Sequence, residues 1–253
     1  NKLKKLFNFY NLDGYIIPKN DEFFVYYVPQ NKDKLKFISN FSGSYGFALI
    51  LKNKNYLFVD GRYTLQAKIQ SGKFFQVITI PHKFPTNILK KKRIKIGFDP
   101  KLHTQKTLKI FFNKTNCKLK PINQNLIDQL WKKKNENNFK KFYILPEKAT
   151  GQNYKSKINK LVKVLNQKKI DFQFISASEN IAWLLNIRGH DSEFTPIPNT
   201  YLALGSNKRI NLFCNLKKIN NSFKKKFKDI RFIDIKYTDL FLSKIRNKKI
   251  LID

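Results

Sequence analysis

The chain has 253 residues, enough for one large domain or two of ordinary size, and 42% of them are hydrophobic, so it is a folding chain. Its 51 Lys and Arg against 17 Asp and Glu give a formal net charge of +34, yet only six of them are arginine, the preferred reader of phosphate and guanine. Lysines spread along the whole chain favour a solvated surface over a nucleic-acid-binding site, and no apolar run reaches the roughly 18 residues of a membrane span.

The cysteines and the two ends of the sequence indicate its context. Cys117 and Cys214 are too few for a disulfide framework and fit a reducing cytoplasm. The start, "NKLKKLFNFYNLDGY", lacks the apolar segment and cleavage site of a secretory signal. The sequence contains no methionine, begins with Asn1 and stops on the strand-like "NKKILID", so we expect it to be cut from a longer cytoplasmic protein.

The first half alternates short apolar runs with helical patterns, as in an α/β domain. Gly, Pro, Asn and Asp bound the apolar runs, which predicts strands over residues 13–18, 46–51, 55–60, 75–80 and 93–99. The second and third of these strands form a hairpin that turns at residues 52–55. Helices are predicted over residues 62–72, 103–114 and 124–134, the first of them ending at Gly72.

The second half repeats this alternation after a polar stretch over residues 132–141, the predicted linker between domains 1–140 and 141–253. Helices are predicted over residues 153–169, 178–186, with Ser178 as the N-cap, and 237–247. Strands are predicted over residues 170–177, 200–205, 209–214, 230–235 and 248–253. The fold class is therefore α/β, with two tandem domains that each contain a mixed sheet and flanking helices.

The two halves also resemble each other in sequence. "LDGYIIPKNDE" pairs with "IDFQFISASEN", and "FISNFSG" with "WLLNIRG", where Asn and Gly stand three apart in each. "YGFALILKNKNYLFV" then pairs with "TYLALGSNKRINLFC", a hairpin in both. Three motifs in the same order predict two copies of one α/β unit.

The segment 186–201, "NIRGHDSEFTPIPNTY", concentrates Arg188, His190, Asp191 and Glu193 in a chain that is poor in His and in acids. Its glycine and prolines predict a loop, and loops often carry function. The three histidines of the chain are scattered, and adjacent ligands on one loop rarely close a metal site. No serine or cysteine has a histidine in a catalytic spacing either, so we expect no catalytic residue and no metal ligand in this chain.

"VDGRYTLQA", residues 59–67, is the most specific short motif. Asp60 and Gly61 form a turn at the end of a strand, and Arg62 opens the next helix. A guanidinium there can meet a substrate carboxylate or carbonyl, or it can simply pair with Asp60 at the surface. The residue chemistry leaves both interpretations open.

Six motifs, "GYIIPKNDE", "FSGSYGFALI", "VDGRYTLQA", "GFDPKLH", "NLIDQLW" and "ENIAWLLNIRGHD", stand in the order found in Xaa-Pro aminopeptidases. The chain resembles the two creatinase-like N-terminal domains of the three-domain aminopeptidase P type and ends where the "pita-bread" metallopeptidase domain would begin. The resemblance departs at "FFVYYVP", where Tyr26 stands in place of an expected Glu.

The resemblance implies an enzyme that removes the N-terminal residue from peptides with proline in second position. It places two divalent metals, manganese in most members, in the missing C-terminal domain, and none in this chain. Residues 1–253 would then shape the cleft for short Xaa-Pro peptides, contact their own catalytic domain and support a homodimer. Arg62 would touch substrate, while Asp60, Arg188 and Asp191 would be structural, Arg188 pairing with Asp191. The alternative is a free-standing, non-catalytic peptide-binding or dimerisation module.

Overall fold

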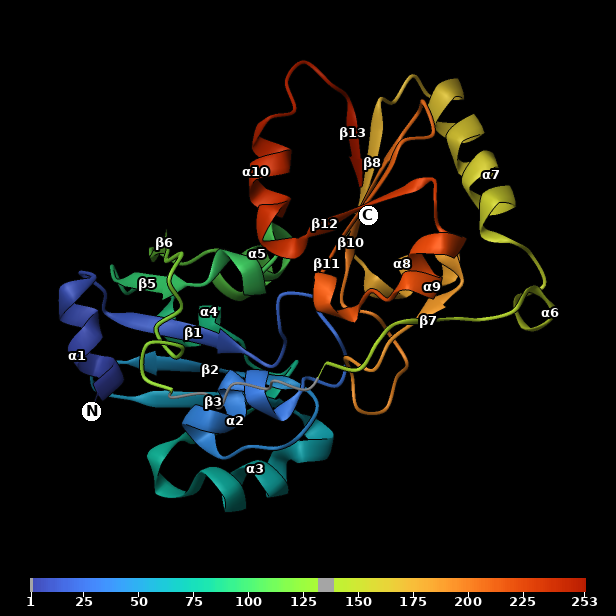
Figure 1. The fold of residues 1–253 in the computed structure, drawn as a ribbon. Helices are drawn as coiled ribbons and strands as arrows, with labels where there is room; N and C mark the ends of the chain where they lie inside the picture. The colour runs from blue at the N-terminus through green and yellow to red at the C-terminus, as the bar shows by residue number, and fades with distance from the viewer. Residues whose placement is uncertain (1, 132–138) are drawn as a thin grey trace. The chain divides into compact units, whose positions relative to one another are not determined.

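The computed structural model describes residues 2–131 and 139–253, which divide between two compact units, Asn1–Asn135 and Glu136–Asp253. Figure 1 shows that each unit contains its own sheet. The linker predicted over residues 132–141 falls, from 132 to 138, outside the described residues. The domain boundary predicted at residue 140 therefore stays a prediction.

The first unit contains a six-stranded mixed sheet in the order β4-β3-β2-β1-β5-β6 (Figure 1). β1 runs antiparallel to β2 and β2 to β3, whereas the β3–β4, β1–β5 and β5–β6 pairs are parallel. The central strands are apolar on both sides because helices cover both faces of the sheet. The strands are β1 (Gly14–Pro18), β2 (Gly46–Leu51), β3 (Asn55–Asp60), β4 (Gln76–Ile80), β5 (Lys95–Phe98) and β6 (Lys118–Pro121).

Two groups of helices cover the faces of this first sheet. Leu3, Phe7, Leu35 and Ala67 bring α1, α2 and α3 onto one face. The other face is covered by α4 and α5 through Leu89, Leu108, Phe111 and Phe112. The helices are α1 (Lys2–Phe9), α2 (Lys34–Ser39), α3 (Thr64–Ser71), α4 (Pro85–Leu89) and α5 (Gln105–Phe112), with 3-10 turns η1 (Gln30–Lys32), η2 (Gly61–Tyr63), η3 (Gly72–Phe74) and η4 (Pro100–Leu102).

The second unit contains a five-stranded mixed sheet in the order β12-β11-β10-β8-β13 and a small two-stranded sheet of β7 and β9. β8 and β11 each run antiparallel to β10, whereas the β11–β12 and β8–β13 pairs are parallel. The strands are β7 (Tyr143–Ile144), β8 (Phe172–Ile175), β9 (Ile187–Arg188), β10 (Tyr201–Gly205), β11 (Ile210–Cys214), β12 (Ile230–Asp234) and β13 (Ile250–Ile252).

The two faces of the five-stranded sheet are covered unequally. α7, α8 and α9 contribute to a large core on one face. On the other face only α10 packs among the described residues, through Phe241 and Leu242 on a small core of Phe174, Ala203 and Phe213. The helices are α6 (Glu147–Thr150), α7 (Tyr154–Gln167), α8 (Ser178–Leu185), α9 (Asn221–Lys226) and α10 (Thr238–Ser243), with 3-10 turns η5 (Leu216–Lys218) and η6 (Ile235–Tyr237).

The predicted duplication is confirmed by strand order and direction. β4, β3, β2, β1 and β5 correspond in turn to β12, β11, β10, β8 and β13, with every pairing parallel or antiparallel alike. One contact recurs at the start of both units. Asp13, just before β1, accepts the Lys95 amide at 2.9 Å, and Asp171, just before β8, accepts the Lys249 amide at 2.9 Å. Each carboxylate therefore ties its first strand to its fifth.

Two local predictions are wrong. Residues 126–130 form hydrogen-bonded turns, where a helix over 124–134 was predicted; residues 132–134 of that prediction lie outside the described residues. The Asn125 side chain accepts the amide of Ile127 at 2.9 Å, which satisfies the backbone locally without a helix. Ala177, not Ser178, is the N-cap of α8, and the Ser178 hydroxyl donates instead to the Thr200 carbonyl at 3.5 Å.

Other local predictions are confirmed. The β2–β3 hairpin turns at the predicted place, where the Leu51 amide donates to the Lys54 carbonyl at 2.8 Å. Gly72 ends α3 with φ +55°, a conformation that glycine adopts without a Cβ clash. Within residues 2–131 and 139–253, no helix is both long and apolar enough to cross a membrane.

Candidate functional site

Asp60 and Arg62 form a compact polar turn where β3 ends. The Asp60 carboxylate accepts the Arg62 amide at 3.0 Å and its Nε at 2.9 Å. The surface pair that the sequence allowed is therefore present. Hydrogen bonds from the Arg62 side chain, then from its amide, lower the pKa of Asp60, and the same side-chain contact raises the pKa of Arg62. The Arg62 side chain is still 67% exposed, so one face of the guanidinium is open to solvent.

A chain of hydroxyl groups continues from this turn. The Arg62 guanidinium lies over the Tyr63 ring at 5.4 Å. The Tyr63 hydroxyl is 2.8 Å from Ser44 Oγ, which in turn is 3.3 Å from the Tyr26 hydroxyl. Ser44 is thus bonded to two phenols, which are too weakly basic to activate it as a nucleophile. The arrangement can orient a polar ligand by hydrogen bonds, but it offers no catalytic base.

A cavity of about 270 Å³ adjoins these hydroxyl groups within the first unit. Aromatic side chains form much of its wall, and three of them are also solvent-exposed, Phe24 at 48%, Tyr26 at 57% and Tyr45 at 53%. Phe24 adopts φ +55°, an unusual conformation for a bulky residue. The sequence pattern did not predict this cavity, because much of its wall comes from irregular segments after β1 and before β2, with β2, η4 and α5 completing it. The one signal was Tyr26 itself, which departs from the aminopeptidase motif.

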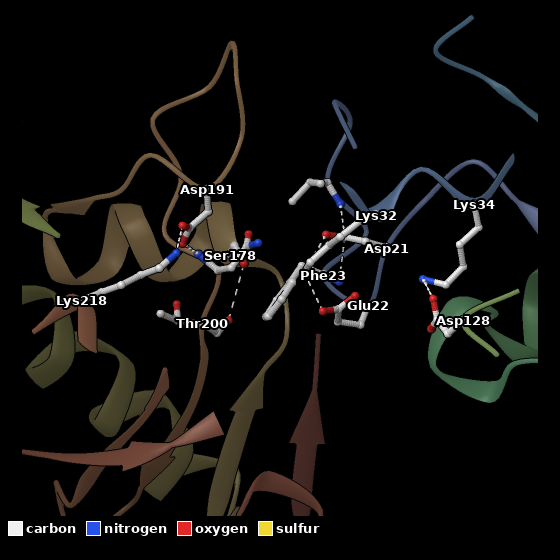
Figure 2. Close-up of polar contacts among 12 residues, drawn as sticks. Asp21, Glu22, Phe23, Lys32, Lys34, Asp128, Ser178, Asp191, Thr200 and Lys218 are labelled. Carbon is white, nitrogen blue, oxygen red and sulfur yellow. Dashed lines mark hydrogen bonds and ion pairs between the residues drawn. The ribbon is translucent and has the colours of Figure 1, made fainter. Parts of the chain in front are cut away.

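In the second unit, Asp191 anchors the loop of residues 186–201. Its carboxylate pairs with Lys218 and accepts the Asn199 amide at 2.7 Å (Figure 2). The Asp191 side chain is only 7% exposed, so the ion pair is largely removed from water. Gly189 packs against the far end of the same loop, where an added Cβ would lie 2.8 Å from the Cα of Pro198. The loop is held closed by its own backbone and one buried ion pair.

The expected pairing of Arg188 with Asp191 is wrong. Among the described residues, Asp191 pairs with Lys218, and Arg188 Nη1 donates to the carbonyls of Ala182 at 3.0 Å and Ile187 at 2.8 Å. Lys218 lies 27 residues along the chain from Asp191, so no local pattern indicates the contact.

Arg188 instead donates hydrogen bonds at the C-terminal end of α8. Lys157, on α7, donates to the Trp183 carbonyl and to Asn186 Oδ1, each at 2.6 Å. Two cations therefore bond the last carbonyls of one helix, where its dipole is negative. Burial, and to a lesser extent Arg188, lowers the pKa of Lys157. The contacts of Arg188 are therefore with the helix end, and its structural role stays a prediction.

A second ion pair fixes the irregular segment after β1. Lys32 contacts Glu22 at 2.6 Å and Asp21 at 3.5 Å, and it lies over the Phe23 ring at 4.8 Å (Figure 2). Asp21 is fully buried, and its carboxylate also accepts the Phe23 amide at 3.0 Å. Burial raises the pKa of Asp21 despite Lys32. These contacts hold the wall of the cavity rather than offering a reactive group.

The part of the chain that the structure describes contains no cluster of three or more His, Cys, Asp or Glu able to hold a metal. His103 is buried, with Nδ1 3.0 Å from the Asp99 carbonyl, and burial lowers its pKa. Burial raises the pKa of the Cys117 thiol, and it raises that of Cys214 to about 12, so neither sulfur is a ready thiolate. The donor set does not fit a divalent metal.

Comparisons with known proteins extend these observations. Residues 1–130 match a family described as "Creatinase/Prolidase N-terminal domain", and residues 133–253 match a second family with the same description. A "Probable Xaa-Pro aminopeptidase P" of Coprinopsis cinerea is 29% identical over 231 residues, which covers 87% of this chain and 37% of that protein. A "Probable Xaa-Pro aminopeptidase P" of Penicillium rubens is 31% identical over 214 residues, covering 80% of this chain and 35% of that protein.

A solved structure has the same fold. The X-prolyl aminopeptidase of Caenorhabditis elegans, described as a cytosolic enzyme with a di-nuclear active site, matches with a TM-score of 0.88 at 24% identity. The match covers 96% of this chain and 43% of that one, so the chain spans well under half the length of the relatives it matches. The family resemblance drawn from the motifs is confirmed, and the chain belongs to the creatinase/prolidase N-terminal domain family, of which it contains two tandem copies.

Proposed function

We propose that residues 1–253 form the non-catalytic N-terminal part of an Xaa-Pro aminopeptidase, which removes the first residue from peptides with proline in second position. One observation carries the proposal: the tandem pair of units has the fold of an X-prolyl aminopeptidase over 96% of the chain. The curated relatives that match both units are named as aminopeptidases of this type, and this chain covers 37% of the first of them.

In this proposal the hydrolytic chemistry belongs to a C-terminal domain outside residues 1–253. Two divalent metals, manganese by family resemblance, would lie there and activate the attacking water. The described residues offer no ligand set for such a metal, so their contribution is to bind and orient. The enzyme would act in the cytoplasm as a homodimer on short peptides.

Arg62 is our candidate for contact with the peptide. Its guanidinium is exposed, oriented by Asp60 and supported by the Tyr63 ring, so it is preorganised to meet a carboxylate or carbonyl group. The neighbouring Tyr26 and Ser44 hydroxyls could add hydrogen bonds to the same ligand. This assigns substrate binding to the first unit, with Asp60 in a positioning role.

The test compares residues 1–253 with the longer polypeptide in a proline-peptide assay and in a calorimetric titration with manganese. We expect the longer protein to bind metal and cleave Xaa-Pro peptides, and residues 1–253 to fold but do neither. Micromolar manganese binding with turnover by residues 1–253 would contradict the proposal. A stop codon directly after Asp253 would instead favour a free-standing peptide-binding or dimerisation module.

A further inference from the structure

The two sheets differ at one edge. The strand register shows which residues of the two edges are equivalent. β5 pairs with β1 so that Ile96 lies opposite Gly14, and β13 pairs with β8 so that Ile250 lies opposite Phe172. Gly14 and Phe172 follow Asp13 and Asp171, the two carboxylates that tie first strand to fifth strand in each unit. Ile250 is therefore the equivalent of Ile96, and Ile252 that of Phe98.

These equivalent positions have very different environments. Ile96 is 0% exposed, whereas Ile250 is 37% and Ile252 67% exposed. In the first unit, β6 pairs in parallel with the outer edge of β5. In the second unit, no strand among the described residues pairs with the outer edge of β13. An apolar strand with an open edge is a template for pairing with another strand.

The sheet face beside this edge is also incompletely covered. In the first unit α5 lies on that face, where Phe111 stacks on Phe47 with ring centroids 4.1 Å apart. In the second unit α10 corresponds to α4, but within residues 139–253 no helix takes the place of α5. The core on this face contains only Phe174, Ala203 and Phe213 as buried members, and Leu240 of α10 is 50% exposed.

β13 is nevertheless held firmly in the sheet. The Asp253 carboxylate accepts the amides of Ser176 at 2.8 Å and Ala177 at 3.1 Å, just before α8. Asn180 adds a hydrogen bond to the same carboxylate at 3.3 Å. The strand is thus fixed on its inner side while its outer side stays open, so the edge is already formed for a partner.

We infer that the outer edge of β13, together with the adjoining face beside α10, is the docking surface for a further helix and strand of the same polypeptide. They would fold onto the second unit as α5 and β6 fold onto the first, the strand parallel to β13 and the helix as its crossover. The helix would present apolar side chains to Phe174 and Ile252. The relatives support this occupant, because their chains are more than twice as long as the matched part.

Hydrogen exchange tests the inference on residues 1–253 and on the longer polypeptide. We expect the outward-facing amides of residues 250–252 to exchange about 100-fold more slowly in the longer protein, because a new strand would bond them. Equal exchange in the two proteins would overturn the inference. Protection in residues 1–253 that rises with protein concentration, together with a dimer in sedimentation, would also overturn it, because a second copy would then be the occupant.

A pair of matched variants gives an independent readout. Ile252→Lys should leave the melting temperature of residues 1–253 unchanged, since the side chain is already exposed, but lower that of the second unit in the longer protein by several degrees. Ile69→Lys, at an 82% exposed position on α3, is the control and should be neutral in both. An Ile252→Lys variant as stable as the control in the longer protein would contradict the docking. Neither readout depends on peptidase activity.

Discussion

The loops that lead into the central hairpins of the two units are held in place by different contacts. In the first unit Asn40 ends α2 at φ 60°, and in the second Asn186 ends α8 at φ 57°, each with a glycine three residues on. The first loop is short and is fastened from outside, since Gln66 and Gln70 of α3 both donate to Ser42 Oγ, at 2.9 and 2.8 Å.

The second loop is longer and is held by an ion pair and by packing between its own two ends. The buried pair of Asp191 with Lys218 of η5 and the packing of Gly189 on Pro198 hold it. The same fold therefore accepts an inserted loop when the polar groups of the insertion find partners within the loop or on a neighbouring element. These different contacts should give measurable differences in stability.

The largest expected effect is on the buried ion pair. Asp191→Ala leaves Lys218 without this carboxylate in a largely buried site, so we expect the free energy of unfolding of the second unit to fall by about 3 kcal/mol. Ser42→Ala, which removes only neutral hydrogen bonds from the first loop, should cost about 1 kcal/mol. Urea denaturation followed by unit-resolved hydrogen exchange measures both. Equal losses would mean that the two loops are fastened with similar strength.

The two asparagines provide the next comparison. Asn186→Ala replaces an asparagine, which tolerates the left-handed region, by an alanine, which does so less well, and it removes the acceptor of Lys157 and the donor to the Gln152 carbonyl. We therefore expect a loss of about 2 kcal/mol. Asn40→Ala carries only the conformational cost, about 1 kcal/mol, because Asn40 is exposed. Asn→Gly at both sites is the control: it should rescue position 40 but only partly rescue position 186. Full rescue at both would show that the Lys157 contact contributes nothing.

Equivalent substitutions in the two units should differ clearly in their effect on peptidase activity, although the two folds are alike. Asp60 corresponds in register to Asn215, which accepts the Lys217 amide at 3.0 Å as Asp60 accepts that of Arg62. Arg62→Ala in the longer enzyme should lower kcat/KM for Xaa-Pro peptides about tenfold, equivalent to about 1.4 kcal/mol, with the melting temperature nearly unchanged. Lys217→Ala, the matched control, should leave kcat/KM unchanged. A destabilised Arg62→Ala protein with normal turnover would show a structural role instead.

The smallest expected effect is on the pH dependence of the stability of the first unit. Burial lowers the pKa of His103 below its ordinary value of 6.5, so the unfolded chain binds this proton more readily than the folded chain. Stability should hold above pH 6.5 and decrease as pH falls through that value, because the buried site disfavours the protonated ring. His103→Gln should flatten this part of the profile for the first unit. An identical profile in the variant would exclude His103 as the cause.

The fold was largely predictable because its signals are local. Glycine, proline and asparagine bounded apolar runs of strand length, and the recurrence of "N-x-x-G" before a hairpin indicated the duplication. The short helices α1, α2, α4 and α9, of five to eight residues, were missed, because helices of this length take their stability from the sheet on which they pack.

The candidate site was less predictable, because its contacts are not local. The Asp60–Arg62 pair could be anticipated, since the two residues are neighbours in one turn. The Tyr26, Ser44 and Tyr63 hydroxyls meet only after strands β1, β2 and β3 have paired. Asp191 meets Lys218 only because the end of β11 lies near its loop, so a nearer arginine was the natural but mistaken choice.

The aspartates that tie the first strand of each unit to the fifth bear on the order in which the strands pair during synthesis. Asp13 meets Lys95 across 82 residues, and Asp171 meets Lys249 across 78, whereas each central hairpin closes within a few residues. Closing a long loop costs chain entropy before any contact repays it. We therefore expect the hairpin of each unit to form early on the ribosome and the fifth strand to join last. The first unit can be complete before the second has emerged, which keeps two similar sequences from exchanging strands.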